Sequence, residues 1–299
     1  MKNLLVFMSI GLFFACGGSK KVAQKHTNTV ISENNAPVKS DSTEITLSIK
    51  EKAPETPIEE TKPIENKEKI PNQTTQMVKA AKVVSEPMSH QSWNSLLGKH
   101  VSKDGNVSYK GFQQDRVMFE SYLAELSENV PKNDWSKEDK LAYWINVYNA
   151  YTIKLIIDNY PLKSIKDIKD PWDLRFFKLG KKWFTLNDIE HRILRKMEDP
   201  RIHFGINCAS FSCPPLLNKA FTSQNVNQEL DKLAISFIND TKRNTIYAEK
   251  VELSKIFSWF GKDFKKEGSL IDFLNKYSTI IINSNAKKSF KTYDWSLNE

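Results

Sequence analysis

The sequence predicts an α+β fold, in which a mostly helical single domain with a small β-sheet occupies residues 91–299. All seven tryptophans lie beyond residue 90, and the roughly 210 residues that hold them suffice for one hydrophobic core. Apolar residues recur at helical spacing in several long runs, whereas alternation of apolar and polar residues is limited to short segments. These two observations favour helices around one core, with few strands.

The longest helical pattern begins at Ser136 and ends at Pro161. Ser136 with Asp139 forms a start that resembles a capping box, and proline stops a helix. Apolar residues lie on every side of this run, so we predict a central helix that is covered on most sides. Asn146 and Asn149 occupy neighbouring positions on it, and their amides need partners if they are buried. Either they bind loop backbone and stabilise the fold, or they line a binding site.

A second helix is predicted from Leu186 to Met197, with Thr185 and Asp188 at its start. Glu190 projects into the apolar stripe of this helix, His191 lies at its border, and Arg195 points nearly opposite. A carboxylate directed at the core is costly unless it is paired. Glu190 is therefore either a structural ion-pair partner or a site carboxylate with a shifted pKa. The stripe comprises Leu186, Ile189, Ile193 and Met197.

Apolar and polar residues alternate from Ile202 to Cys208, which predicts a short strand. His203 and Asn207 then share its polar face, and Gly205 between them leaves room for a substrate or another backbone. Cys208 faces away from His203 unless the strand ends or bends at Asn207.

The remaining elements follow from local signals. Prolines at positions 214 and 215 make residues 209–215 a loop. Helical patterns lie at residues 228–239 and 270–282, and a strand is indicated near residues 245–253.

The N-terminal residues predict export and lipid anchoring. Residues 1–16 combine Lys2 with an apolar core of signal-peptide length, and Ala15 before Cys16 resembles a bacterial lipoprotein cleavage site. We expect an acylated Cys16 that binds membrane lipid, on the periplasmic face of the outer membrane. The alternative is an ordinary secreted protein in which Cys16 is removed or free. Residues 17–90 contain no aromatic residue and six of the twelve prolines, so we expect a disordered tether.

The charge of the chain limits its partners. The net charge is +8, of which Lys2 and the tether each carry +1, so the globular part carries +6. This excess shows no clustered basic stripe, and we expect no nucleic-acid partner. Glycine-rich phosphate loops and dinucleotide motifs are absent, so we expect no cofactor.

Five runs of the sequence resemble a bacterial and plant family catalogued as domain of unknown function 547. Together they cover most of residues 91–299, and the resemblance implies no established reaction. The runs are LAYWINVYNAYTIKLI at 141–156, LNDIEHRILR at 186–195, RIHFGINCASFSCPP at 201–215, LSKIFSWFGKDF at 253–264 and YDWSLN at 293–298. The positions to which the resemblance points are Asn146, Asn149, Glu190, His191, His203, Asn207, Cys208, Ser210 and Cys213.

Two interpretations of Cys208 and Cys213 stay open. In an oxidising envelope they form a structural disulfide. Alternatively, one of them is the nucleophile of a thiol hydrolase, with His203 as base and a third member such as Glu190 or Asn207. Asn146 or Asn149 then binds the oxyanion. Such a domain would be cysteine-hydrolase-like and would act on peptides, peptidoglycan or envelope proteins.

The same residues allow three further interpretations. His191, His203 and a cysteine lack the spacing of a metal site, so we expect no metal. Ser210 lacks the elbow motif of serine hydrolases, and we expect its hydroxyl to bind the loop. A non-catalytic binding module is the second class of function, in which Trp172, Trp183 and Trp259 hold a glycan or peptide.

Overall fold

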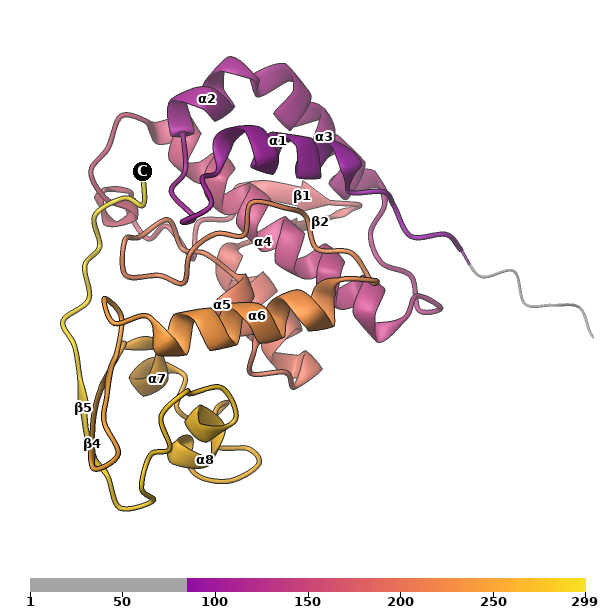
Figure 1. The fold of residues 1–299 in the computed structure, drawn as a ribbon. Helices are drawn as coiled ribbons and strands as arrows, with labels where there is room; N and C mark the ends of the chain where they lie inside the picture. The colour runs from indigo at the N-terminus through magenta and orange to yellow at the C-terminus, as the bar shows by residue number, and fades with distance from the viewer. Residues whose placement is uncertain (1–84) are drawn as a thin grey trace, which may run out of the picture. The chain divides into compact units, whose positions relative to one another are not determined.

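A computed structural model describes residues 85–299 (Figure 1). The predicted leader with Cys16 and the predicted tether up to residue 84 lie outside these residues. Residues 85–90, which we expected in the tether, contact the domain: the side chains of Ser85 and Asp134 are hydrogen bonded at 2.9 Å, and His90 is buried. The folded region therefore begins ahead of residue 91.

The N-terminal half is helical and packs around the predicted central helix. The helices are α1 (Gln91–His100), α2 (Tyr109–Gln114), α3 (Arg116–Glu128) and α4 (Lys137–Asn159). The N–H of Asp139 donates to the Ser136 hydroxyl at 3.0 Å, which confirms the predicted helix start. Side chains on every face of α4 are buried, as its apolar composition predicted. Figure 1 shows α1, α2 and α3 together at one end of the domain.

After α4 comes a small antiparallel hairpin and then the predicted second helix in an altered form. The hairpin pairs β1 (Phe177–Leu179) with β2 (Lys182–Phe184). The N–H of Asp188 donates to the Thr185 hydroxyl at 3.0 Å, which confirms the predicted cap. The helix itself is a π-helical turn (Asp188–Ile193) followed by a 3₁₀ turn (Leu194–Met197). Side-chain directions therefore differ from those of an α-helix, and Arg195 lies close enough to Glu190 for its charge to act on that carboxyl group.

The strand predicted from Ile202 to Cys208 is wrong. These residues begin with one helical turn, α5 (Ile202–Gly205), and continue as extended backbone from Ile206. Asp199 accepts a hydrogen bond from the N–H of Arg201 at 2.9 Å, and Pro200 lies just ahead of the N-cap residue Arg201, where its lack of an N–H leaves no helical hydrogen bond unmade. Every side chain of α5 is buried, so the alternation in the sequence did not mark one exposed face.

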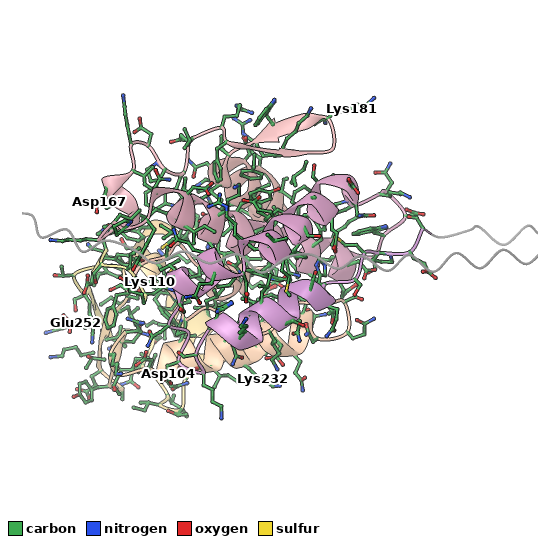
Figure 2. All side chains as sticks on the ribbon, turned by 90° about the horizontal axis from the view of Figure 1, so that it is seen from above. Asp104, Lys110, Asp167, Lys181, Lys232 and Glu252 are labelled. Atoms are coloured by element: carbon green, nitrogen blue, oxygen red, sulfur yellow. The ribbon has the colours of Figure 1, made fainter. Side chains whose placement is uncertain are left out.

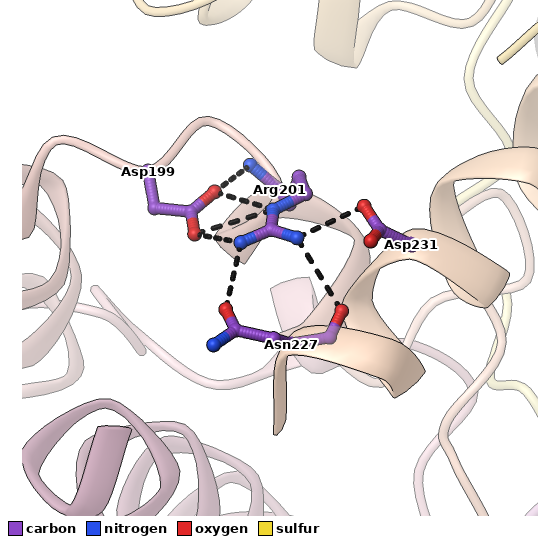
Figure 3. Close-up of polar contacts among 4 residues, drawn as sticks. All are labelled: Asp199, Arg201, Asn227 and Asp231. Carbon is purple, nitrogen blue, oxygen red and sulfur yellow. Dashed lines mark hydrogen bonds and ion pairs between the residues drawn. The ribbon is translucent and has the colours of Figure 1, made fainter. Parts of the chain in front are cut away.

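Arg201 fixes α5 against α6 (Val226–Asn239), the helix that confirms the pattern predicted at residues 228–239. Its guanidinium lies 2.6 Å from an Asp199 oxygen and 2.9 Å from an Asp231 oxygen, and it also donates to Asn227 (Figure 3). Gly205 also lies close to α6, because a Cβ there would lie 2.8 Å from the end of the Leu230 side chain, which would have to shift. The glycine makes room for α6, not for a substrate.

The C-terminal part builds a second, smaller core. Its elements are β3 (Thr245–Ile246), β4 (Lys250–Leu253), α7 (Ile256–Trp259), α8 (Leu270–Asn275) and β5 (Lys287–Phe290). β4 pairs antiparallel with β3 and parallel with β5, so the strand predicted near residues 245–253 is a hairpin of two short strands. The helix predicted to reach residue 282 ends at Asn275, whose side chain binds the backbone of Ile282 at 2.9 Å on both N–H and carbonyl. The mostly helical α+β class is confirmed.

Residues 291–299, the closing segment, run from β5 back across the domain to the side of α2. The N–H of Phe211 donates to the Ser296 carbonyl at 2.7 Å, and the N–H of Leu297 donates to the Lys163 carbonyl at 3.0 Å. The Tyr109 hydroxyl donates to the Asn298 side chain at 2.6 Å. The closing segment therefore joins regions that are far apart in the sequence, and it lies against the loop that carries the cysteines.

The surface carries charges of both signs on several sides. Asp104, Lys110, Asp167, Lys181 and Glu252 are exposed and project outward in different directions in Figure 2. Among residues 85–299, no helix is long and apolar enough to cross a membrane.

Candidate functional site

A cavity of about 210 Å³ collects most of the residues that the sequence singled out. Its walls come from α4, the π-helical turn, residues 203–214, α7 with the residues after it, and the closing segment. The polar and sulfur-bearing residues that line it are Tyr148, Asn187, Glu190, His191, His203, Cys208, Cys213 and Tyr293. Its remaining walls are largely aromatic, from Trp172, Trp259, Phe260 and Trp295.

The two thiols lie in contact at the wall of the cavity and are both free. Cys208 is partly exposed and Cys213 is buried, and their sulfurs are 3.1 Å apart. The Cys208 sulfur also lies 3.2 Å from the Ser210 hydroxyl and 3.4 Å from the Tyr293 hydroxyl. Hydrogen bonding of the Cys208 sulfur with Cys213, and with Ser210 and Tyr293, lowers the pKa of Cys208 to about 6 although desolvation opposes the shift. Cys208 is therefore largely a thiolate at neutral pH.

The backbone around Cys208 is shaped by a local side-chain hydrogen bond. Ala209 has a φ of 60°, a left-handed conformation that is uncommon outside glycine. The side-chain oxygen of Asn207 accepts from the Ala209 N–H at 2.8 Å, which stabilises the turn. The turn brings Cys208 to the cavity that His203 also lines. The chain therefore bends at Asn207, as a site shared by Cys208 and His203 requires.

His203 is held by a carboxylate on a distant segment. Its Nε2 lies 2.9 Å from Oδ2 of Asp263, and Asp263 in turn binds Arg195 at 2.6 Å and 3.0 Å. The ring stacks on Phe260 with centroids 4.0 Å apart, and burial lowers the pKa of His203. Burial alone would raise the pKa of Asp263, but the hydrogen bonds from His203 and Arg195 outweigh it and the pKa is lowered. Nδ1 of His203 is buried and has no hydrogen-bond partner among the described residues.

Glu190 is a buried carboxyl group in the same cavity. The Tyr148 hydroxyl donates to its Oε2 at 3.2 Å, and no basic side chain forms an ion pair with it among residues 85–299. Burial, with a further contribution from the charge on Cys208, raises the pKa of Glu190 to about 7. The predicted role as a structural ion-pair partner therefore has no partner among the described residues, whereas a site carboxylate with a shifted pKa fits. Glu190 is half protonated near neutral pH.

The predicted asparagines lie outside the cavity lining and bind backbone. Asn149 donates to the Gly205 carbonyl at 2.9 Å and accepts from the Asn207 N–H at 2.8 Å. Asn146 binds both backbone groups of Phe221 in the same way. Asn207 donates to the Pro214 carbonyl at 2.8 Å. Because each amide binds loop backbone and neither residue lines the cavity, Asn146 and Asn149 hold loops in place and are not positioned to bind an oxyanion there.

The remaining predicted residues have varied positions. His191 lines the cavity, but it is exposed and its Nδ1 lies 2.8 Å from Arg195. Ser210 is buried beside the thiols, and its hydroxyl lies 2.8 Å from that of Tyr293. Trp172 and Trp259 line the cavity as the binding-module interpretation required, whereas Trp183 is exposed on β2 and is not among the lining residues.

Sequence reasoning missed Asp263 and Tyr293, which respectively orient His203 and contact Cys208. Each lies in a run that resembles the family, at residues 253–264 and 293–298, but neither run was given a chemical role. That membership is the signal that could have found them.

Comparisons with known proteins agree with the resemblance. Residues 132–238 match the family model described as protein of unknown function, DUF547, which confirms the family recognised from the sequence. The matched segment includes Glu190, His203 and both described cysteines, while Asp263 and the closing segment lie beyond it. No curated protein and no solved structure matches the chain.

In the described part of the chain, no three His, Cys, Asp or Glu residues group as metal ligands.

Proposed function

We propose that this chain, which carries a DUF547 domain at residues 132–238, is an envelope lipoprotein that hydrolyses amide or ester bonds with Cys208 as nucleophile. One observation carries the proposal. A partly exposed thiol with a pKa of about 6 lines the same cavity as a histidine with an unpartnered nitrogen and a buried carboxyl group. Thiolate nucleophile, base and acid are the three groups that such hydrolysis needs.

Cys208 starts the reaction without a base to activate it. Its thiolate attacks the carbonyl carbon of a substrate, and a tetrahedral intermediate forms. The hydrogen bonds that the Cys208 sulfur shares with Cys213, Ser210 and Tyr293 lower its pKa, so the thiolate is already present at neutral pH. Those hydrogen bonds also make Cys208 a competent leaving group when the acyl-enzyme is hydrolysed.

Glu190 supplies the proton to the leaving group. Collapse of the intermediate breaks the carbon–nitrogen or carbon–oxygen bond, and an expelled amine needs a proton to leave. A carboxyl group with a pKa of about 7 keeps that proton near neutral pH, unlike an exposed glutamate. The products of this step are a thioester on Cys208 and the Glu190 carboxylate.

His203 serves the second step, in which water attacks the thioester. Burial favours the neutral ring, and Asp263 binds Nε2, so Nδ1 carries the lone pair. Nδ1 accepts the proton of the attacking water, the acid product leaves, and the Cys208 thiolate is regenerated. Transfer of that proton to Glu190 restores the starting state, and the net reaction consumes one water.

The aromatic walls favour a substrate with flat apolar surfaces near the scissile bond. Trp259 is about half exposed, and its ring stacks on Trp295 with centroids 5.7 Å apart. Such rings bind sugar faces and peptide planes. Together with the anchor predicted at Cys16, this supports peptides, peptidoglycan or envelope proteins as substrates, reached from the periplasmic face of the outer membrane.

The hydrolase is tested by trapping its intermediate. The full chain with Cys16→Ser leaves Cys208 and Cys213 as its cysteines. It is mixed with p-nitrophenyl acetate, quenched in acid and mapped by mass spectrometry. We expect a burst of nitrophenol and one acetyl group on Cys208, and slower hydrolysis of that thioester in His203→Ala. A chain that shows no burst and no acetylated Cys208 contradicts the proposal.

The lipid anchor needs its own experiment. Cells that express the full chain are labelled with radioactive palmitate and fractionated. We expect label in the protein in the membrane fraction, and none in Cys16→Ser. A wild-type protein without label contradicts the proposed lipid attachment at Cys16. That result does not bear on the proposed hydrolase activity.

A non-catalytic binding module is the second candidate, and the half-exposed Trp259 favours it. Titration of peptidoglycan fragments distinguishes the two. Binding that is lost in Trp259→Ala, in a chain that never forms an acyl-enzyme, supports the module.

A further inference from the structure

The two cysteines differ in how an incoming molecule can reach them. Cys208 is partly exposed at the cavity, whereas Cys213 is 6% exposed. The sulfurs are in contact at 3.1 Å, and the N–H of Cys208 also donates to the Cys213 sulfur at 3.1 Å. A molecule that enters the cavity therefore reaches Cys208 first, with Cys213 directly behind it.

The hydrolase does not explain why a second thiol occupies this position. A hydroxyl group would also form a hydrogen bond with the Cys208 sulfur, as the hydroxyls of Ser210 and Tyr293 do. A thiol is needed where the second group must itself form a bond to sulfur. A partly exposed nucleophilic thiol with a buried thiol behind it is the arrangement that thiol–disulfide exchange requires.

We infer that the pair also catalyses thiol–disulfide exchange, in which Cys208 attacks a disulfide of a peptide or small molecule and Cys213 resolves the mixed disulfide. This activity goes beyond the proposed hydrolysis. It uses the same nucleophile but needs no acyl substrate, no Glu190 and no His203.

Electrons and protons balance within the two steps. The Cys208 thiolate attacks one sulfur of the substrate disulfide, the substrate S–S bond breaks, and the first substrate thiolate leaves. A mixed disulfide now joins Cys208 to the second substrate sulfur. Cys213 then attacks the Cys208 sulfur and gives its proton to the departing second thiolate. The substrate gains two electrons and leaves as one thiolate, which takes a proton from water, and one thiol, while the protein pair loses two electrons and becomes a Cys208–Cys213 disulfide.

The local contacts favour this order of events. Burial and the adjacent charge on Cys208 raise the pKa of Cys213, so Cys213 stays protonated while Cys208 is a thiolate. Once Cys208 is in a mixed disulfide, that adjacent charge is gone and Cys213 loses its proton more readily. The loop between the thiols is short and closed by a hydrogen bond from the Cys213 N–H to the Ser210 carbonyl at 3.0 Å. The resolving thiol is therefore already beside its target.

The test uses glutathione as the probe. The full chain with Cys16→Ser is equilibrated in mixtures of reduced and oxidised glutathione, quenched in acid, and analysed by intact-mass spectrometry after thiol labelling. We expect a single two-electron conversion to the Cys208–Cys213 disulfide as oxidised glutathione increases. Cys213→Ser in the same background should accumulate one glutathione on Cys208. Cys208→Ser should leave Cys213 unmodified over the same time.

Two outcomes overturn the inference. One is a pair that stays reduced in excess oxidised glutathione while iodoacetamide still alkylates Cys208. The other is a Cys16→Ser protein that retains glutathione on Cys208 without forming the internal disulfide. The first readout needs no substitution in the cavity, so misfolding of a cavity variant cannot cause it. Acetylation of Cys208 by p-nitrophenyl acetate is measured separately, so the hydrolase and the exchange activity can fail independently.

Discussion

Two buried polar networks meet at residues 205–214, and they differ in how well their groups are satisfied. On one side, the amides of Asn149 and Asn207 bind backbone groups at 2.8 Å to 2.9 Å. On the other side, Nδ1 of His203 has no described partner, and Cys208 and Glu190 have pKa values shifted toward neutrality. Buried polar groups with complete hydrogen bonding stabilise a fold, whereas incompletely satisfied groups at a cavity are available for chemistry.

The comparison separates two kinds of effect. Removing a partner from the satisfied network leaves buried groups unpaired, which costs about 1–3 kcal/mol per group in unfolding free energy. Changing a cavity group removes a reactive atom and leaves the backbone of the loop in place. Substitutions on the first side should act on stability, and those on the second side should act on rate or on pH dependence.

The largest expected effect is the loss of hydrolysis in Cys208→Ser. A serine hydroxyl at this position is not ionised, so we expect the rate to fall on the order of 10⁴-fold. The free energy of unfolding should change by less than about 1 kcal/mol, because volume and polarity are nearly kept. Turnover and chemical denaturation measure the two quantities. A variant that loses stability as well as turnover would place Cys208 in the stabilising network instead.

Next in size is the destabilisation that we expect in Asn149→Leu. The substitution leaves the Gly205 carbonyl and the Asn207 N–H without their partners in the core. The free energy of unfolding should fall by about 3 kcal/mol, measured by urea denaturation. Asn133→Leu is the matched control, because Asn133 is exposed and its side chain should contribute little. Equal stability of the two variants would contradict the division between the networks.

A smaller effect, on rate and pH dependence, is expected in Glu190→Gln. Cys208 must be deprotonated, so activity rises with pH through about 6, and Glu190 must be protonated, so activity falls through about 7. The variant should lose about 10²-fold in rate and lose the fall near pH 7. Steady-state rates from pH 5 to 9 provide the measurement, with the exposed Glu252→Gln as control. An unchanged alkaline limb would exclude Glu190 as the acid.

Glu190→Gln should also change how the stability of the protein depends on pH. The folded-state pKa of Glu190 is raised from 4.5 to about 7, so the folded protein holds the proton more tightly than the unfolded chain. The contribution of Glu190 to stability is therefore fully present below about pH 4.5 and is lost as pH rises through about 7. We expect Glu190→Gln to lack this loss when unfolding is measured between pH 5 and 8. Parallel curves for both proteins would argue against a buried protonated carboxyl group.

The smallest expected effect concerns the thiolate itself. Tyr293→Phe removes one of the donors that stabilise Cys208. One hydrogen bond to a charged group is worth about 1.4 kcal/mol, which raises the thiol pKa by about one unit. The pH dependence of iodoacetamide alkylation measures it, with Tyr247→Phe as the exposed control. No displacement of the alkylation curve would remove Tyr293 from the site.

The sequence predicted those parts of the fold whose signals are local. The caps at Ser136 and Thr185 and the amphipathic pattern of α6 each depend on residues within a few turns, and all three were found. The segment from Ile202 to Cys208 was misread because alternation predicts a strand only where one face meets solvent. Here both sets of side chains are buried, and the turn set by Asp199 decides the conformation.

The site was predictable only in part for the same physical reason. Glu190, His203 and Cys208 lie close enough in sequence to be grouped by chemical type. Asp263 and Tyr293 reach them from segments 60 and 85 residues away, and no periodic pattern states which distant segments will pack together. Their contributions, an oriented imidazole and a stabilised thiolate, are set by tertiary contacts alone.

The closing segment also has a consequence for biosynthesis. Because residues 291–299 leave the ribosome after every other part of the cavity has been made, the nascent chain holds Cys208 without the phenol of Tyr293 beside it. During translation the sulfur is thus a weaker acid and a poorer nucleophile. The full set of hydrogen bonds around Cys208 is therefore completed only when the closing segment has docked.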